Sequence, residues 1–245
     1  MMKLINKTYH YLKNKGLILT LLKIWDYIIY KLKIRKIKFT PVKVNQGNLG
    51  IISIPKGVNL ECKDKNLTTN VGLHISIKCI EKLHDSTQAD WEFRRNTQGL
   101  IVKQRWWNLP LSHIWYITVH PNKIIWTITM EIENVLILDE IKAGILIRSD
   151  YNKVKIDDNI YSFPEAKNWE LLGIWENKNS LIFLTAQNYP EIRFRILKSL
   201  YPVFLIAQNT DEYLNGRLAQ IGFLKTLEFP AGRYRLAKLE VEILP

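Results

Sequence analysis

Residues 103–133 read KQRWWNLPLSHIWYITVHPNKIIWTITMEIE and hold four of the eight tryptophans of the chain. In the last ten of them, 124–133, apolar and polar side chains alternate, which is the pattern of a β-strand with one buried face. One face carries Ile124, Trp126, Ile128, Met130 and Ile132, and the other carries Thr127, Thr129, Glu131 and Glu133. The alternation therefore predicts that Trp126 lies in a hydrophobic core.

The same alternation extends towards the start of the stretch. Trp115 is in phase with the apolar residues around it, whereas Tyr116 and His120 point to the opposite face. Trp115 is therefore expected in the core as well. Trp106 and Trp107 are consecutive, so in a strand they point to opposite faces. One of these two rings is expected to be exposed, or covered from outside the core.

The hydrophobic period of two persists from residue 42 to the end of the chain, in at least eleven segments separated by turn material such as PNK and SDYNK. No helical pattern interrupts these segments, and sheets without crossover helices are antiparallel. We therefore predict an all-β fold for residues 41–245, a large antiparallel two-sheet β-sandwich (supersandwich). A basic amphipathic N-terminal α-helix is predicted to precede it, in residues 1–40.

The composition is that of a folded globular protein, with 47% hydrophobic and 24% charged residues among 245. The net charge of +12 is concentrated at one end, because residues 1–38 hold ten Lys or Arg and one acidic residue, Asp26. The remainder is nearly neutral, which disfavours nucleic acid as its partner. Cys62 and Cys79 are in phase with apolar neighbours, which predicts two buried side chains and leaves open a disulfide between adjacent strands.

Residues 15–33 are amphipathic on a helical wheel, with Leu, Ile and Trp on one half and mainly Lys, Thr and Tyr on the other. Lys23 and Asp26 interrupt the apolar run, so a transmembrane span is not expected, and the pattern of a signal peptide fits poorly. The apolar face packs either on the rest of the protein or on an anionic membrane. In the membrane alternative the contact residues are Lys15, Lys23, Trp25, Ile28, Lys31 and Lys33. The protein would then be cytoplasmic and peripheral to the inner face of the membrane.

Several segments, taken in order, resemble a known superfamily. They are Gly72-Leu73 with the following HISIK, the hairpin DSTQADWE at 85–92, a basic strand ending in tryptophan, the link NLPLSHIW at 108–115, the strand at 124–133, and the closing hairpin FPAGRYRL at 229–236. Over residues 45–245 they resemble the galactose mutarotase-like β-sandwich, which includes aldose epimerases and the sandwich domains of polysaccharide lyases. They are most similar to sandwich domains found with bacterial cell-surface polysaccharide enzymes.

The resemblance implies a saccharide ligand on the concave face of one sheet, but it does not carry catalysis across. Aldose epimerases use a histidine acid and a late glutamate base, and the nearest late acid here is Glu228, in what reads as an ordinary hairpin. Polysaccharide lyases take part of their catalytic set from a helical domain, for which this sequence shows no pattern. Both departures favour a protein without catalysis of its own.

Sugar recognition needs a flat ring against C–H groups and polar side chains for the hydroxyl groups. Residues of these types on neighbouring predicted strands give the candidate carbohydrate-binding set Arg105, Trp107, His113, Tyr116, His120 and Arg148. Basic residues there would suit an acidic polysaccharide, because guanidinium pairs with carboxylate in a bidentate manner. The alternative is a solvated strand face and, for His113, a hydrogen-bonded histidine at a strand entry.

No metal-binding box, phosphate loop or nucleophile motif occurs, so no metal or cofactor is expected. His84 beside Asp85 comes nearest to an acid-base pair, but adjacent residues rarely converge on one substrate atom. The leading hypothesis is a non-catalytic, carbohydrate-associated β-sandwich that acts in cell-surface polysaccharide biosynthesis or modification, with saccharides, an anionic membrane and glycan-synthesis enzymes as partners. The alternatives are a divergent enzyme of the aldose epimerase, mutarotase or polysaccharide lyase type, and a nucleic-acid binder.

Overall fold

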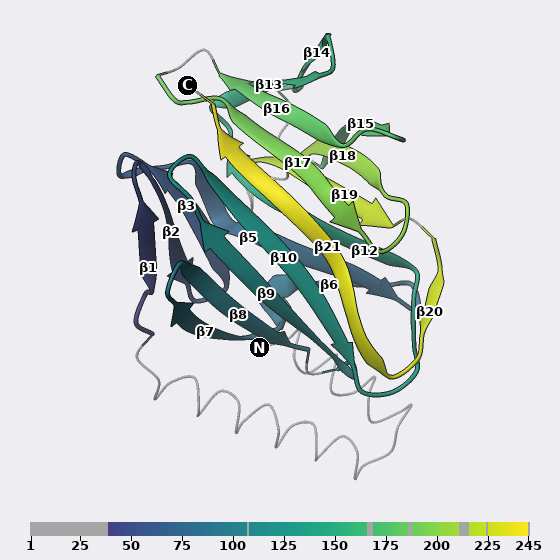
Figure 1. Cartoon of the computed structure of the whole chain (residues 1–245). Helices are drawn as coiled ribbons and strands as arrows, with labels where there is room; N and C mark the ends of the chain where they lie inside the picture. The colour runs from purple at the N-terminus through teal and green to yellow at the C-terminus, as the bar shows by residue number, and fades with distance from the viewer. Residues whose placement is uncertain are drawn as a thin grey trace, which may run out of the picture. The chain divides into compact units, whose positions relative to one another are not determined.

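The computed structural model describes residues 39–106, 108–165, 169–185, 188–210, 216–223 and 225–244. Within them the fold consists of two large antiparallel sheets, one two-stranded ribbon and one turn of 3-10 helix, η1 (Ser86–Gln88) (Figure 1). The predicted all-β, two-sheet architecture is confirmed. The predicted helical segment 1–40 lies almost entirely outside the described residues, so the helix and its boundary stay predictions.

The first sheet has ten strands among the described residues, and we call it the ten-stranded sheet. Its strands in spatial order are β1 (Lys43–Gln46), β2 (Leu49–Ile54), β3 (Gly57–Cys62), β5 (Thr68–Cys79), β12 (Glu140–Arg148), β19 (Gly216–Phe223), β18 (Phe204–Asn209) and β15 (Glu170–Trp175). Two short strands lie off this path, β4 (Lys65–Asn66) beside β3 and β6 (Lys82–Asp85) beside β5. Segments far apart in the sequence therefore meet at its centre, where β12 lies between β5 and β19.

The second sheet has nine strands within the described part of the chain, and we call it the nine-stranded sheet. In spatial order they are β14 (Asn159–Ser162), β13 (Tyr151–Ile156), β16 (Ser180–Thr185), β17 (Ile192–Ser199), β21 (Gly232–Ile243), β10 (Lys123–Ile132), β9 (Leu111–Val119), β8 (Gly99–Arg105) and β7 (Asp90–Asn96). The ribbon pairs β11 (Leu136–Leu138) with β20 (Leu227–Phe229). We use outer face for the side of each sheet that points away from the shared core.

The core lies between the two inner faces and contains the predicted tryptophans. Trp115 on β9 and Trp126 on β10 are both fully buried, and their ring centroids are 4.8 Å apart in an edge-on arrangement. Cys62 and Cys79 are buried and free, so the prediction of two small buried side chains is confirmed and no disulfide joins them. Alternation of side chains along pleated strands thus places the predicted residues inside.

The structure has more strands than the eleven segments expected from the sequence, and at two places it also divides or extends an expected element differently. The segment 135–141 (VLILDEI), one of the eleven apolar segments expected as single strands, is divided between β11 and β12, which belong to different sheets. The break falls at Asp139, whose carboxylate accepts hydrogen bonds from the Glu81 backbone and the Thr226 hydroxyl. The segment SDYNK, expected as a turn, contributes its last three residues to β13. The first of them, Tyr151, is fully buried, and its hydroxyl donates to the Pro190 carbonyl.

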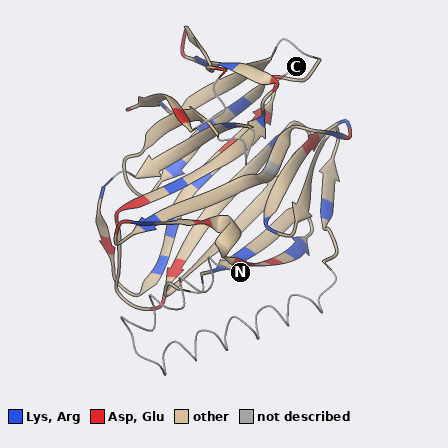
Figure 2. Cartoon of the chain, turned by 180° about the vertical axis from the view of Figure 1, so that it is seen from behind, with Lys and Arg blue, Asp and Glu red and all other residues tan. Residues whose placement is uncertain are grey.

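Basic and acidic residues are interspersed over the described strands (Figure 2). This distribution agrees with the near-neutral balance expected for the β-sandwich segment. Among the residues that the structure describes, no helix is long and apolar enough to cross a membrane.

Candidate functional site

A hollow of about 300 Å³ lies on the outer face of the ten-stranded sheet. We call it the first hollow. Its walls come from β5, β6, β12, β18 and β19, and from a tryptophan just before β15. It is lined by Val71, His74, Ser76, Leu83, Asp85, Glu140, Lys142, Leu146, Trp169, Gln208, Leu218 and Gln220. An aromatic ring, aliphatic side chains and hydrogen-bonding groups therefore share one surface.

The floor of the first hollow is a row of three residues across three strands. Gly144 on β12 is in register with His74 on β5 and with Gln220 on β19. The backbones of β5 and β19, with β12 between them, are about 10 Å apart. Because Gly144 has no side chain, His74 and Gln220 meet over it, and their Nε2 atoms are 3.0 Å apart. A Cβ on Gly144 would lie 2.5 Å from Cγ of Gln220, so the glycine is needed for this contact.

His74 and Gln220 form an uncharged, buried hydrogen-bonding pair. Burial lowers the pKa of His74, although the nearby Asp85 carboxylate acts in the opposite direction, so the imidazole is neutral at pH 7. The Gln220 amide donates to Nε2 of His74 when the imidazole proton is on Nδ1. The amide oxygen Oε1 of Gln220 is buried and has no hydrogen-bond partner among the described residues. Such an acceptor is costly unless a ligand or water donates to it.

The charged residues at the rim of the first hollow already have partners. Asp85 accepts a hydrogen bond of 2.7 Å from the backbone N–H of Thr87, which caps η1. Glu140 pairs with Lys142 at 2.8 Å on the same strand. Both carboxylates are therefore engaged in contacts within the protein.

Apart from Ser76 and Gln208, the remaining surface of the first hollow is apolar. Val71, Leu146 and Leu218 form a small buried cluster that is separate from the main core, although they lie on the outer face of the sheet. Trp169 lines the same hollow with about half of its surface exposed, at 51%. A partly exposed indole beside aliphatic groups suits the C–H face of a sugar ring. No group of three His, Cys, Asp or Glu side chains able to hold a metal ion occurs in the described ranges.

The predicted carbohydrate-binding residues do not form one surface. Arg105 at the end of β8 and Tyr116 on β9 are exposed residues of the nine-stranded sheet, and His120 follows β9 in a half-buried position. Arg148 belongs to the other sheet, where it pairs with Asp150 at 2.6 Å. Trp107 lies outside the described residues. None of those that are described lines the first hollow.

His113 lies in the core and not on a binding surface. Its side chain is fully buried, and Nδ1 accepts a hydrogen bond of 3.0 Å from the indole N–H of Trp106. Burial lowers its pKa to about 3, so the ring is neutral at physiological pH. Of the two interpretations of His113 from the sequence, a sugar contact and a hydrogen-bonded histidine in the strand, the structure agrees with the second.

The two other sequence candidates for acid-base chemistry do not assemble into a catalytic pair. His84 is buried and meets the ring of Trp106 edge-on at 6.3 Å, whereas its neighbour Asp85 lines the first hollow. Adjacent residues on a strand point to opposite faces, which separates them. Glu228 is an exposed residue of β20, paired with Ile137 across the ribbon.

Sequence reasoning missed the residues of the first hollow, although a weak signal is present. In VGLHISIKC, His74 and Ser76 alternate with core residues, which places polar groups on the outer face of a strand. Such positions are normally solvated, yet His74 is only 6% exposed. Burial on the outer face depends on residues far away in the sequence, so the local pattern could not reveal it.

No family model and no curated protein sequence matches the chain. Solved structures do match. A galactose mutarotase related enzyme from Lactobacillus acidophilus aligns with a TM-score of 0.62 and 7% identity, over 84% of this chain and 98% of that chain. For a galactose mutarotase-like protein from Clostridium acetobutylicum the TM-score is 0.54 and the identity 10%, over 83% and 94% of the two chains.

A larger enzyme contains the same architecture. The 4-alpha-glucanotransferase of Thermococcus litoralis aligns with a TM-score of 0.54 and 9% identity, over 84% of this chain and 37% of that one. At such identities the likeness establishes the fold alone. The chain has the galactose mutarotase-like fold that its sequence resemblance implied.

Proposed function

We propose that this protein, which has the galactose mutarotase-like fold, binds a saccharide in the first hollow without transforming it. The observation that carries the proposal is the neutral His74 and Gln220 pair, with one buried amide oxygen left to accept a hydrogen bond. The oxygen is buried, so a sugar hydroxyl would donate to it once the Gln220 side chain turns towards the hollow, while the sugar ring packs on Trp169 and the apolar cluster. The floor offers hydrogen bonds in place of a charged acid-base pair.

The proposal extends to a cellular role in cell-surface polysaccharide biosynthesis or modification, with glycan-synthesis enzymes as partners. Support comes from the carbohydrate-related names of proteins that share the fold, among them a mutarotase related enzyme and a glucanotransferase. The second support is the basic first forty residues, which would hold the protein at the inner face of an anionic membrane.

The saccharide proposal is tested by replacing Gln220 with alanine. Loss of the amide removes the hydrogen bond to His74 and the acceptor for the sugar, so affinity should fall by about tenfold. Wild type is first screened on a microarray of neutral mono- and oligosaccharides, and the best binder is then titrated calorimetrically into both proteins. Trp169→Ala should weaken binding similarly through loss of ring stacking.

The matched control is Gln208→Ala, which removes an amide from the edge of the same hollow while the His74 pair remains intact. We expect a smaller loss of affinity in this control. Absence of binding to every saccharide on the array would refute the proposal. Equal affinity of wild type and Gln220→Ala would show that the ligand lies elsewhere.

A second candidate function is that of a divergent carbohydrate-active enzyme of the aldose epimerase, mutarotase or polysaccharide lyase type. The observation in its favour is that Asp85 and Glu140 line the same hollow as His74. The titrated sugars can be followed by polarimetry in the same experiment. Anomerisation above the spontaneous rate that disappears in Asp85→Asn would replace the non-catalytic proposal with this one.

The membrane part of the proposal concerns residues outside the described part of the chain. Changing Lys15, Lys23, Lys31 and Lys33 to glutamate in the full chain should abolish co-sedimentation with vesicles containing phosphatidylserine. The reason is that each basic residue near an anionic surface contributes about 1 kcal/mol of binding free energy. Trp25 and Ile28, the apolar contacts of the predicted helix, stay in place as the control for the apolar contribution. Equal sedimentation of both proteins would contradict the membrane assignment.

A further inference from the structure

A β-bulge in β21 brings two arginines to the outer face of the nine-stranded sheet. Ile128 on β10 pairs with Ala237, and the next residue, Thr129, pairs with Arg235, so Leu236 is an extra residue in the ladder. A shift of one residue moves all following side chains to the other face of a strand. As a result, Arg233 and Arg235 lie on the same outer face as the later polar residues of β21, while Leu236 and Ala237 are both buried.

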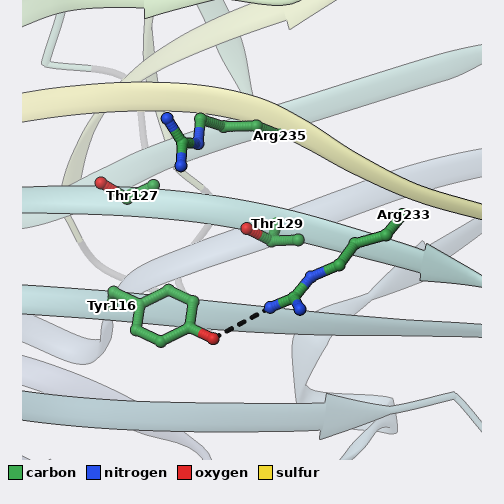
Figure 3. A pocket seen from close by; sticks show the side chains of 5 residues that line it. All are labelled: Tyr116, Thr127, Thr129, Arg233 and Arg235. Carbon is green, nitrogen blue, oxygen red and sulfur yellow. Dashed lines mark hydrogen bonds between the residues drawn. The ribbon is translucent and has the colours of Figure 1, made fainter.

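The two arginines line a second hollow, together with Tyr116, Thr127 and Thr129 from β9 and β10 (Figure 3). The side chain of Arg233 extends over β10 to β9, where its Nη2 donates a hydrogen bond of 3.0 Å to the Tyr116 hydroxyl. Its Nε is 3.5 Å from the Glu131 carboxylate. Arg233 is therefore held in place by two partners.

Arg235 differs from its neighbour because no hydrogen bond or ion pair holds its guanidinium within the described part of the chain. It is paired with Thr129 on β10, and its guanidinium lies over β10 on the side of Thr127 (Figure 3). An arginine fork with its donors available, next to a second arginine that is already oriented, is the arrangement that recognises a planar carboxylate in a bidentate manner.

Further basic residues lie across the sheet from these two arginines. Strand register aligns Arg235 with Thr129 on β10, Ile114 on β9 and Lys103 on β8. The adjacent row runs from Arg233 through Glu131 and Ser112 to Arg105 in the same way. Three strand spacings separate the basic ends of each row, or about 14 Å. A distance of this size spans several sugar units, so the two basic ends of a row would face charged units that are not adjacent in an oligosaccharide.

We propose that this second hollow, on the sheet opposite the first one, binds the carboxylate groups of an anionic saccharide that contains uronic acid. Arg235 and Arg233 bind one carboxylate, the Tyr116 ring offers a flat surface to the sugar, and the threonine hydroxyls lie within the same hollow. Arg105 and Lys103 extend the site to a further acidic residue of the chain. The inference is independent of saccharide binding in the first hollow.

The test uses the full-length protein and a short oligogalacturonate, with a neutral oligogalactoside of equal length for comparison. Arg235→Ala should weaken binding of the oligogalacturonate by about tenfold, because a charge-assisted pair is lost. Arg235→Lys should recover part of this loss, since lysine keeps the charge but not the planar fork. Thermal melting of each variant verifies that the exposed substitution leaves the fold intact.

The matched control is Arg94→Ala on β7, which removes the same charge from the same sheet outside the hollow. Arg94→Ala should bind the oligogalacturonate with the affinity of wild type. Gln220→Ala should also leave oligogalacturonate binding unchanged. An equal loss in Arg94→Ala would overturn the proposal, because it would reveal unspecific charge attraction. Equal binding of the neutral oligogalactoside, or Arg235-dependent binding to anionic vesicles in place of the glycan, would overturn it as well.

Discussion

Replacement of Trp126 by alanine is expected to lower the free energy of unfolding by about 3 to 5 kcal/mol, which is the usual loss for a large aromatic side chain in a core. The ring is fully buried and in edge-on contact with Trp115, so the substitution removes apolar burial, ring contacts and packing at once. Total stabilities of single domains are about 5 to 15 kcal/mol. A large part of the folded-state stability should therefore be lost.

Chemical denaturation followed by fluorescence and by circular dichroism measures this loss, provided that both probes give the same transition. Trp169→Ala is the matched control, because it removes the same side chain from a half-exposed position. Its effect should stay below about 1 kcal/mol. If the two substitutions cost the same, the core position assigned to Trp126 would be incorrect.

Replacement of Glu240 by glutamine is expected to lower the free energy of unfolding by about 2 kcal/mol at neutral pH. Its carboxylate is only 3% exposed on the outer face of the nine-stranded sheet, where it accepts a hydrogen bond of 2.9 Å from Nε of Arg195 and pairs with Lys123 at 3.1 Å. Arg195 and Lys123 are both more exposed than the carboxylate. Solvent therefore screens the pairs, and the expected loss of stability is smaller than for a fully buried ion pair.

The effect of Glu240→Gln should depend on pH. Burial alone would raise the pKa of Glu240, but hydrogen bonds and charges from Arg195 and Lys123 outweigh it and hold the pKa below the ordinary value of 4.5. A carboxylate whose pKa is lowered by folding stabilises the folded state above the unfolded-state pKa, and this contribution is lost as the pH falls through the folded-state pKa. The difference between wild type and variant should therefore be largest at neutral pH.

Unfolding free energies of the two proteins at pH 7 and near pH 3 provide the measurement. The matched control is Glu92→Gln on β7, whose carboxylate is 66% exposed and 4.0 Å from Arg94. This control should change stability by less than about 0.5 kcal/mol at either pH. A pH-independent difference for Glu240→Gln would show that packing, and not the charge, is responsible for the loss.

The fold was largely predictable because its signal is local. A period of two needs only a few neighbouring residues, and it correctly placed Trp115 and Trp126 in the core. Errors arose where local patterns are ambiguous. The apolar run at 135–141 gives no sign of whether it forms one strand or two strands of different sheets. In the structure the break lies at Asp139, whose carboxylate accepts hydrogen bonds from Glu81 and Thr226.

The candidate sites were less predictable, because they depend on contacts between distant residues. His74 and Gln220 are 146 residues apart in the sequence, and they meet only because β12 lies between their strands with Gly144 at the crossing point. The predicted carbohydrate-binding residues included His113, which lies in the core, and Arg148, which belongs to the ten-stranded sheet. Among its described members, Tyr116 alone lines one of the two hollows.

The phase change in RYRLAKLEVEI, where two apolar residues follow Arg235, was a readable sign of the bulge that exposes both arginines. The sequence by itself determined the all-β class, the buried faces of long strands such as β9 and β10 and the near-neutral charge of the β-sandwich segment, since these are set by neighbouring residues. Strand order and register decided which outer faces became hollows and which polar side chains share them. Both result from pairing between segments far apart in the chain, which no local pattern encodes.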